Sequence, residues 1–206
     1  MTIYMSEILV FTNRTLCREE FLIRIEKLAE AHPEGIVLRE KDLSEEDYKL
    51  LAQDVFEICK KYDVTCILHN FVNVARELQV KHIHLPLPIL RTLSVEERNY
   101  FEILGASCHS VSDAIEAEQL GCTYITAGHI FDTDCKKDLP GRGLKFLDQV
   151  CKSISIPIYA IGGIGPDNIA LVRKVGAKGA CVMSGAMECK NVKEYIAAFK
   201  EKNNEV

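Results

Sequence analysis

The chain has 206 residues, of which 48% are hydrophobic and 27% are charged, a balance typical of a globular protein. This length is enough for one well-buried domain and short for two. With 25 basic and 30 acidic residues, the formal net charge is −5, which argues against a nucleic-acid partner. No apolar stretch approaches the ~18 residues that a membrane-spanning helix needs, and no secretory signal is recognisable, so we expect no membrane partner.

Nine cysteines are spread along the chain, and no two of them form a Cys-x-x-Cys pair. The spacing therefore favours neither a zinc ribbon nor a redox motif. Most lie in apolar company, where free thiols behave as small hydrophobic side chains. We expect reduced, structural cysteines and a cytoplasmic protein. Cys108 and Cys135 are the two that lie in more polar segments.

The first half of the chain alternates short apolar runs with longer amphipathic segments. The runs predict strands at 8–11, 36–38, 66–68 and 82–85, and the segments predict helices at 18–31, at 44–62, through 74–78 and from 94 onward. Ser94 and Glu97 have the spacing of a capping box, and so do Ser44 and Asp47. Pro86 and Pro88 indicate a turn after the fourth strand.

The second half repeats this pattern. Strands are predicted at 103–106, 124–127, 158–161 and 180–183, and helices at 111–120, from 143 to about 153, from Pro166 to just before Gly176, and over 192–199. A long polar segment, 128–143, separates the sixth strand from its helix. It is the longest stretch of the chain without an apolar period.

Eight strand–helix units in series predict the fold. Strands that are apolar at every position are buried on both faces, which is typical of a parallel sheet covered by helices. Eight such units indicate an α/β protein with a (β/α)8 TIM barrel, here a single domain over residues 1–206. An open doubly wound sheet is the competing architecture, but the first strand lacks the glycine-rich dinucleotide fingerprint.

In a barrel of this kind, functional groups lie on the loops that follow the strands. Those positions are more polar and more basic than the chain as a whole, which indicates a small anionic ligand. The candidate substrate-binding residues are Arg39, Lys41, His69, Asn70, Ser107, Thr133 and Lys136. Because few carboxylates accompany the histidines, including the pair His82 and His84, we expect no metal site. His32 and His109 are interpreted as surface or helix-entry residues.

Two glycine-bearing loops indicate where a phosphate binds. Gly162 and Gly163 follow the seventh strand, and Ser184 and Gly185 follow the eighth. The standard phosphate site of these barrels is built from those two loops. Backbone N–H groups can bind an anion there, and glycine permits a close approach.

His129 follows the sixth strand at the predicted mouth of the barrel. An unperturbed imidazole has a pKa near ~6.5, which suits proton transfer at neutral pH. A lone histidine is more often structural. The polar loop behind it favours a catalytic role.

Several motifs resemble the thiamine phosphate synthase/TenI superfamily. The loop from Gly128 to Lys137, Gly-His-Ile-Phe-Asp-Thr-Asp-Cys-Lys-Lys, is similar to the loop after strand six in that family. The segments 38–41, 105–110, 156–164 and 182–185 resemble its motifs at strands two, five, seven and eight. The resemblance covers nearly the whole chain, in order.

The superfamily has two well-known branches. Its synthases join a pyrimidine diphosphate to a thiazole phosphate and use magnesium held by acidic residues after strands three and four. Here strand three ends in His69-Asn70 and strand four leads to Pro86, without an acid, whereas magnesium favours carboxylate oxygens. The resemblance is therefore closer to the TenI-type thiazole tautomerase. It implies an isomerase that converts a carboxythiazole phosphate to its aromatic tautomer without metal or organic cofactor.

In this interpretation His129 is the catalytic acid/base, and a small phosphorylated thiazole is the ligand. The resemblance also implies a homodimer. Three alternatives stay open: a thiamine phosphate synthase that uses Mg²⁺, a catalytically silent phosphate-ligand-binding regulator, and a sugar-phosphate isomerase. For the last, Glu40 is the available carboxylate base.

Overall fold

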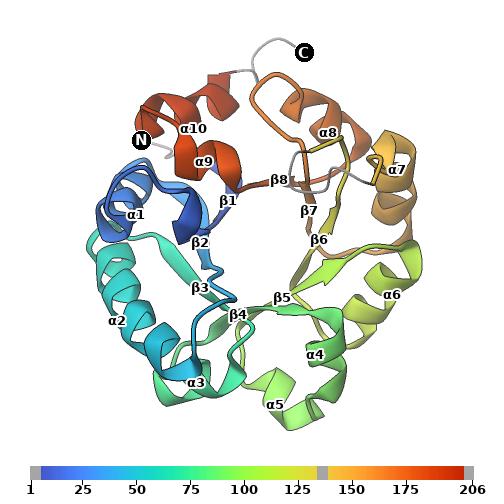
Figure 1. The fold of residues 1–206 in the computed structure, drawn as a ribbon. Coiled ribbons are helices and arrows are strands. Elements are labelled where there is room, and N and C mark those ends of the chain that lie inside the picture. Colours follow the sequence, from blue (N-terminus) through green and yellow to red (C-terminus); the bar gives the residue numbers. More distant parts are fainter. Residues whose placement is uncertain (1–5, 134–138, 202–206) are drawn as a thin grey trace.

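The computed structural model describes residues 6–133 and 139–201. Eight parallel strands form a closed barrel in which each strand pairs with the next, and the last pairs with the first. Figure 1 looks along the barrel and shows the helices as an outer ring around it. The predicted (β/α)8 barrel is thereby confirmed. The strands are β1 (Ser6–Phe11), β2 (Pro33–Leu38), β3 (Thr65–His69), β4 (His82–Pro86), β5 (Ile103–Cys108), β6 (Tyr124–Gly128), β7 (Ile158–Ile161) and β8 (Gly179–Val182).

The helices follow the predicted segments closely where a capping residue marks the start. They are η1 (Arg14–Leu16), α1 (Phe21–Glu30), α2 (Glu45–Lys61), α3 (Val72–Glu77), α4 (Leu87–Thr92), α5 (Val95–Asn99), α6 (Val111–Gln119), α7 (Gly143–Ser153), α8 (Ile169–Val175), α9 (Ser184–Glu188) and α10 (Val192–Glu201). The capping box of Ser94 and Glu97 is present, and Ser44 caps α2. Gly176 ends α8 with a φ of 113°, the left-handed conformation that favours glycine.

The helices differ from the prediction after β4, after β7 and after β8. The turn expected at Pro86 and Pro88 is instead the start of α4, because proline is tolerated in the first turn of a helix, where its missing N–H has no intrahelical partner. The helix expected from Pro166 begins at Ile169, after a turn in which the Asn168 side chain binds the backbone. Helix α9 was not predicted, because five residues are too few to show a period.

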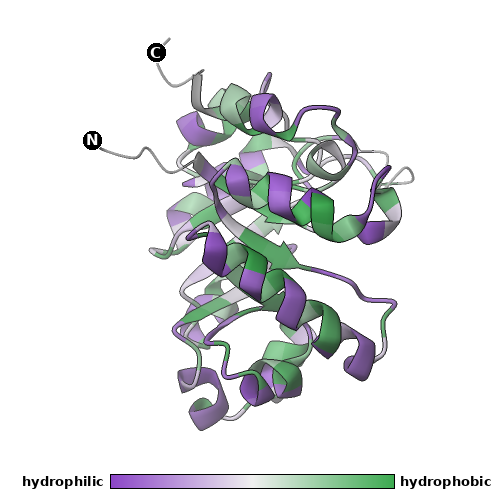
Figure 2. Cartoon of the chain, turned by 90° about the vertical axis from the view of Figure 1, so that its left-hand side faces the viewer, coloured by the Kyte–Doolittle hydropathy of each residue, from purple (hydrophilic) through white to green (hydrophobic). Residues whose placement is uncertain are grey.

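The strands divide the apolar side chains between two cores. Alternate residues point to opposite faces of a strand. A small cluster inside the barrel contains Leu9, Phe11, Val37, Ile67, Tyr124, Tyr159 and Cys181. A larger cluster lies between the strands and the helices and takes the alternate positions, such as Ile8 and Val10. Figure 2 shows the matching pattern on the helices, whose ribbons carry both hydrophobic and hydrophilic residues.

All eight cysteines in the described part of the chain are free thiols, as predicted. Cys108, singled out for its polar surroundings, is buried, and burial raises the pKa of its thiol to about 12. Such a thiol stays protonated and unreactive at neutral pH. Cys135 lies outside the described residues. Over the described ranges, no helix combines the length and apolarity needed to cross a membrane.

Gly105 provides a test of packing inside the barrel. A Cβ atom at this position would lie 2.2 Å from the Tyr124 ring, which is buried inside the barrel. We expect Gly105→Ala to lower the free energy of unfolding by ~1–3 kcal/mol, the usual cost of overpacking. Urea denaturation measures the change. Gly165→Ala is the matched control, since no atom lies within 4 Å of its added Cβ; equal effects of the two substitutions would contradict the packing argument.

Candidate functional site

A cavity of about 390 Å³ opens at the carboxyl end of the strands, within the size range of small-molecule sites. Its described lining includes no Asp or Glu. The side chains come from all eight strand ends. They are Phe11, Arg39, Lys41, His69, Pro86, Ser107, His109, Thr126, Gly128, His129, Thr133, Ile161, Gly162, Gly163, Ile164, Cys181, Val182, Met183, Ser184, Gly185 and Tyr195.

The direction of β2 explains the cationic side of this pocket. Val37 belongs to the cluster inside the barrel, so the residues two and four positions later continue on the inner side. Arg39 and Lys41 accordingly line the pocket. Glu40, between them, is 2% exposed and forms its contacts away from the pocket lining. The end of β2 thus directs Arg39 and Lys41 into the pocket and Glu40 away from it.

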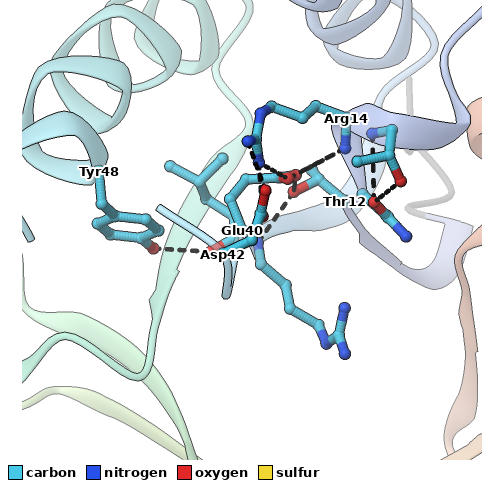
Figure 3. A network of polar contacts seen from close by, with 9 residues as sticks. Thr12, Arg14, Glu40, Asp42 and Tyr48 are labelled. Atoms are coloured by element: carbon cyan, nitrogen blue, oxygen red, sulfur yellow. Dashed lines mark hydrogen bonds and ion pairs between the residues drawn. The ribbon is translucent and has the colours of Figure 1, made fainter. Parts of the chain in front are cut away.

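The Glu40 carboxylate is fully engaged by β1 and η1 (Figure 3). It accepts hydrogen bonds from the Thr12 hydroxyl at 2.7 Å and from the Arg14 backbone N–H at 3.0 and 3.1 Å. The Arg14 guanidinium adds an ion pair at 3.2 Å. A carboxylate held in this way outside the pocket is not placed to remove a proton from a ligand. This geometry removes the basis for the sugar-phosphate isomerase alternative.

Lys41 is partly desolvated by its position. Burial lowers the pKa of its ammonium group, and the charge of Arg39 lowers it further. Within the described residues, no ion pair engages either side chain. Charges that are desolvated and lack a counter-ion favour the binding of an anion. The cationic mouth expected from the sequence is therefore present on the β2 side.

Two stacked histidines form the floor beside these cations. The rings of His69 and His84 are 5.9 Å apart with an interplanar angle of 17°. His84 bonds Ser107 through Nε2 at 2.8 Å and Tyr124 through Nδ1 at 2.9 Å. Burial lowers the pKa of His84 to about 3 and that of His69 to about 2, and the neighbouring His84, Lys41 and Arg39 add to the shift at His69. Both rings are neutral at physiological pH.

Nδ1 of His69 is buried and has no hydrogen-bond partner among the described residues. An unpaired buried polar atom is costly, by ~1–3 kcal/mol. The backbone around it is well fixed, because the Tyr48 hydroxyl accepts from His69 N–H at 2.9 Å and donates to the Leu38 carbonyl at 2.6 Å. The His69 ring is therefore held beside the pocket, and its Nδ1 can still form a hydrogen bond.

The glycines on the opposite side of the pocket have a packing role that the sequence did not reveal. Gly162 and Gly163 have φ values of 98° and 65°, which favour glycine. A Cβ at Gly162 would lie 2.2 Å from that of His129, and one at Gly185 would lie 2.2 Å from the Tyr195 hydroxyl. Because these glycines have no side chain, the β6–α7 loop and helix α10 can pack against them in the pocket wall.

A side-chain amide holds the loop after β7 in shape. Asn168 accepts a hydrogen bond from Gly165 N–H at 3.0 Å and donates one to the Gly163 carbonyl at 2.9 Å. On the other loop, Ser184 and Gly185 are the first residues of α9, and N–H groups in a first helical turn have no intrahelical acceptor. The two predicted phosphate-binding loops therefore lie together in one wall.

His129 is 7% exposed and holds a loop as well as lining the pocket. Its Nε2 lies 3.0 Å from the Leu139 carbonyl oxygen. A carbonyl only accepts hydrogen bonds, so Nε2 donates this one, and Nδ1 forms no hydrogen bond with the described residues. His109 uses its Nδ1 in the same way on the Gly128 carbonyl at 3.0 Å. His109 is exposed and lies directly before α6, as its interpretation as a surface or helix-entry residue predicts, and it also lines the pocket.

Most of the predicted site residues come together at this pocket. Asn70 does not line it; the residue has a φ of 72°, and its N–H donates to the His84 carbonyl. Lys136 lies outside the described residues. Phe11, Thr126 and Tyr195 also line the pocket, although the sequence does not indicate it. Strands β1 and β6 are apolar on both faces, so their patterns do not show which residues face inward, and nothing in the sequence around Tyr195 shows that α10 reaches the barrel mouth.

The neutral histidine pair predicts a pH-dependent stability. Unfolded histidines titrate near ~6.5, whereas the folded values are about 2 and 3, so the unfolded chain binds more protons as pH falls through 6. Stability is then full above pH 6.5 and is lost toward pH 3, with each histidine contributing a slope of up to ~1.4 kcal/mol per pH unit. We expect His69→Asn to reduce the slope between pH 6 and 4 by about that amount. Urea unfolding at several pH values measures the free energy of unfolding, from which the slope is taken. The difference in this free energy between the variant and the natural protein at pH 8 is the internal control. An unchanged slope would contradict the neutral pair.

Comparison with known proteins agrees with this architecture. A family model described as thiamine monophosphate synthase matches residues 8–186. The thiamine-phosphate synthase of Methanobrevibacter smithii is 31% identical, over 94% of this chain and 95% of that protein. The one from Fusobacterium nucleatum subsp. nucleatum is 28% identical over 92% and 93%. The solved structure of thiamine phosphate pyrophosphorylase from Pyrococcus furiosus has a TM-score of 0.81 at 27% identity, covering 95% of this chain and 94% of that one.

These findings correct the predicted activity. The relatives over nearly the full length are named synthases, which are transferases. The expected isomerase of the tautomerase branch is therefore wrong, and the alternative kept beside it fits better. The missing acids after strands three and four bear on metal ligation and do not decide which reaction the barrel catalyses. With the family match spanning most of the barrel, the chain belongs to the thiamine phosphate synthase/TenI superfamily.

Proposed function

We propose that this protein is a thiamine-phosphate synthase, which joins a pyrimidine diphosphate to a thiazole phosphate. The observation that carries the proposal is the full-length similarity to proteins of that name. The pocket supports it, because it offers one wall suited to a phosphate and another suited to a more highly charged anion. Two anionic substrates need two such regions.

The glycine wall is the proposed site for the thiazole phosphate. Gly162, Gly163, Ser184 and Gly185 all line this cavity, and Ser184 and Gly185 are the first residues of α9. Backbone N–H groups that lack an internal acceptor bind phosphate oxygens well. His129 lies against Gly162, and among the described residues only its Nε2 has a hydrogen-bond partner. We propose it as a ligand-contacting residue of this wall.

The β2 side is the proposed site for the diphosphate. As the new bond to the thiazole forms, the bond from the pyrimidine unit to the diphosphate breaks, and its electron pair leaves on a diphosphate oxygen. Fixed cations near that oxygen stabilise the developing charge. Arg39 and Lys41 are the proposed cations, and His69, Ser107 and Thr133 are further proposed ligand contacts in the pocket lining. Lys136 and Asn70 stay predictions, as do the homodimer and the cytoplasmic setting.

The residues present do not fit the magnesium site that the family resemblance implies. Magnesium is held in proteins through carboxylate oxygens. The described pocket lining contains no Asp or Glu, and no group of three or more His, Cys, Asp or Glu side chains in the described ranges is placed to hold a metal. Glu40 is committed to Thr12 and Arg14. The proposed role of the side-chain cations is therefore to neutralise the diphosphate directly.

Lys41→Met tests the proposed reaction. We expect purified protein to form thiamine phosphate from the two substrates in buffer with Mg²⁺, and the variant to lose ~10²-fold in kcat/KM, the usual cost of removing one charge-stabilising donor. Mass spectrometry of the product gives the rate. Lys49→Met is the control: this lysine pairs with Glu77 on the surface and should stay within twofold. No product under any condition, with ligand binding intact, would refute synthase activity.

Calorimetry with inorganic pyrophosphate tests the neutralisation by side chains. We expect binding in EDTA with a Kd within tenfold of that in Mg²⁺, because the fixed cations do not depend on an ion. Lys41→Met should weaken binding in both buffers. Pyrophosphate that binds only when Mg²⁺ is present would show that the side chains do not suffice.

A further inference from the structure

The segment after β2 alternates the sign of its charges. Arg39 and Lys41 line the pocket, whereas Glu40 and Asp42 are held by Arg14. The two acids flank Lys41 directly in the chain, and Asp42 is exposed enough to turn. Left to itself, an acid so close to a pocket cation would pair with it. A cation so paired would no longer be available to a ligand.

Arg14 binds both acids at once (Figure 3). Its Nη1 lies 3.2 Å from Glu40 Oε2 and 2.6 Å from Asp42 Oδ1, and its Nη2 lies 2.5 Å from Asp42 Oδ2. The two-point contact with Asp42 uses the planar fork of the guanidinium, which a lysine cannot reproduce. The contact lowers the pKa of the Asp42 carboxyl, so Asp42 stays charged and attached to Arg14.

The same network fixes the backbone that carries the pocket cations. The Thr12 hydroxyl donates to Glu40 and accepts from Arg39 N–H at 2.9 Å. Glu40 also accepts from the Arg14 backbone N–H, a contact that does not involve the Arg14 side chain. The guanidinium is thus the part of the network that controls Asp42, while Glu40 keeps other partners.

We infer that Arg14 is a positioning residue that keeps Lys41 free for the anionic ligand by holding Glu40 and, above all, Asp42 away from it. Arg14 is absent from the pocket lining described for this chain. It acts through Lys41 and does not touch the ligand. This inference rests on the proposed anion site on the β2 side, and it adds a residue to which that proposal gave no role.

The test measures the binding of inorganic pyrophosphate by calorimetry. We expect Arg14→Gln to raise the Kd at least tenfold, and Arg14→Lys to raise it less, because lysine keeps the charge but not the fork. Arg91→Gln is the matched control. Arg91 forms a partly exposed two-point pair with Glu116 on the outer helices, so its loss should change the Kd less than twofold. Thermal unfolding of each variant checks that it folds.

A double substitution separates a positioning role from a general structural one. If Arg14 acts through Lys41, then Arg14→Gln should change the Kd less than twofold in a Lys41→Met background, although it changes it tenfold in the natural one. An equal loss in both backgrounds would overturn the inference. If Lys41→Met binds pyrophosphate normally, the proposed anion site itself fails. If Lys41→Met weakens binding and Arg14→Gln does not, only the role of Arg14 fails.

Discussion

Closure of eight strands into a ring decides where each polar side chain of this protein lies. In a closed parallel barrel, alternate residues face a narrow interior, and the last inward residue of each strand faces the mouth. Val37 fixes the phase of β2, and Arg39 and Lys41 follow on the same side. Glu40 falls on the other side, where Thr12 and Arg14 satisfy it. A shift by one residue would exchange the cations for the acid.

Closure of the barrel therefore gathers cations at the pocket, although the chain as a whole is acidic. The net charge is −5, yet the described pocket lining has cations and no carboxylates. Lys41 is partly desolvated and pairs with no acid of the described residues, which is unfavourable in the free protein, as its lowered pKa reflects. An anionic ligand relieves that cost. The neutral histidines beneath, buried and stacked, add hydrogen-bonding groups without adding charge.

The missing acids after β3 and β4 do not identify the reaction. The absence of acids after β3 and β4 is a sound observation about metal ligation, and the structure agrees with it across the described pocket. It says less about which bond is made or broken, because side-chain cations can stabilise a departing anion as well. His129 shows a related limit. Its Nε2 proton is committed to the Leu139 carbonyl, a contact between residues ten positions apart that only the folded loop creates.

The eight strand–helix units, the barrel, the family and most of the residues at the mouth can be predicted from the chain. They depend on local apolar periods, on capping residues and on the order of motifs along the chain. Tertiary structure alone decided the rest. Phe11, Thr126 and Tyr195 enter the pocket, Asn70 stays out of its lining, and Arg14 reaches Glu40 and Asp42 from another strand end. Uniformly apolar strands hide which residues face inward, and contacts between distant segments exist only once the ring has closed.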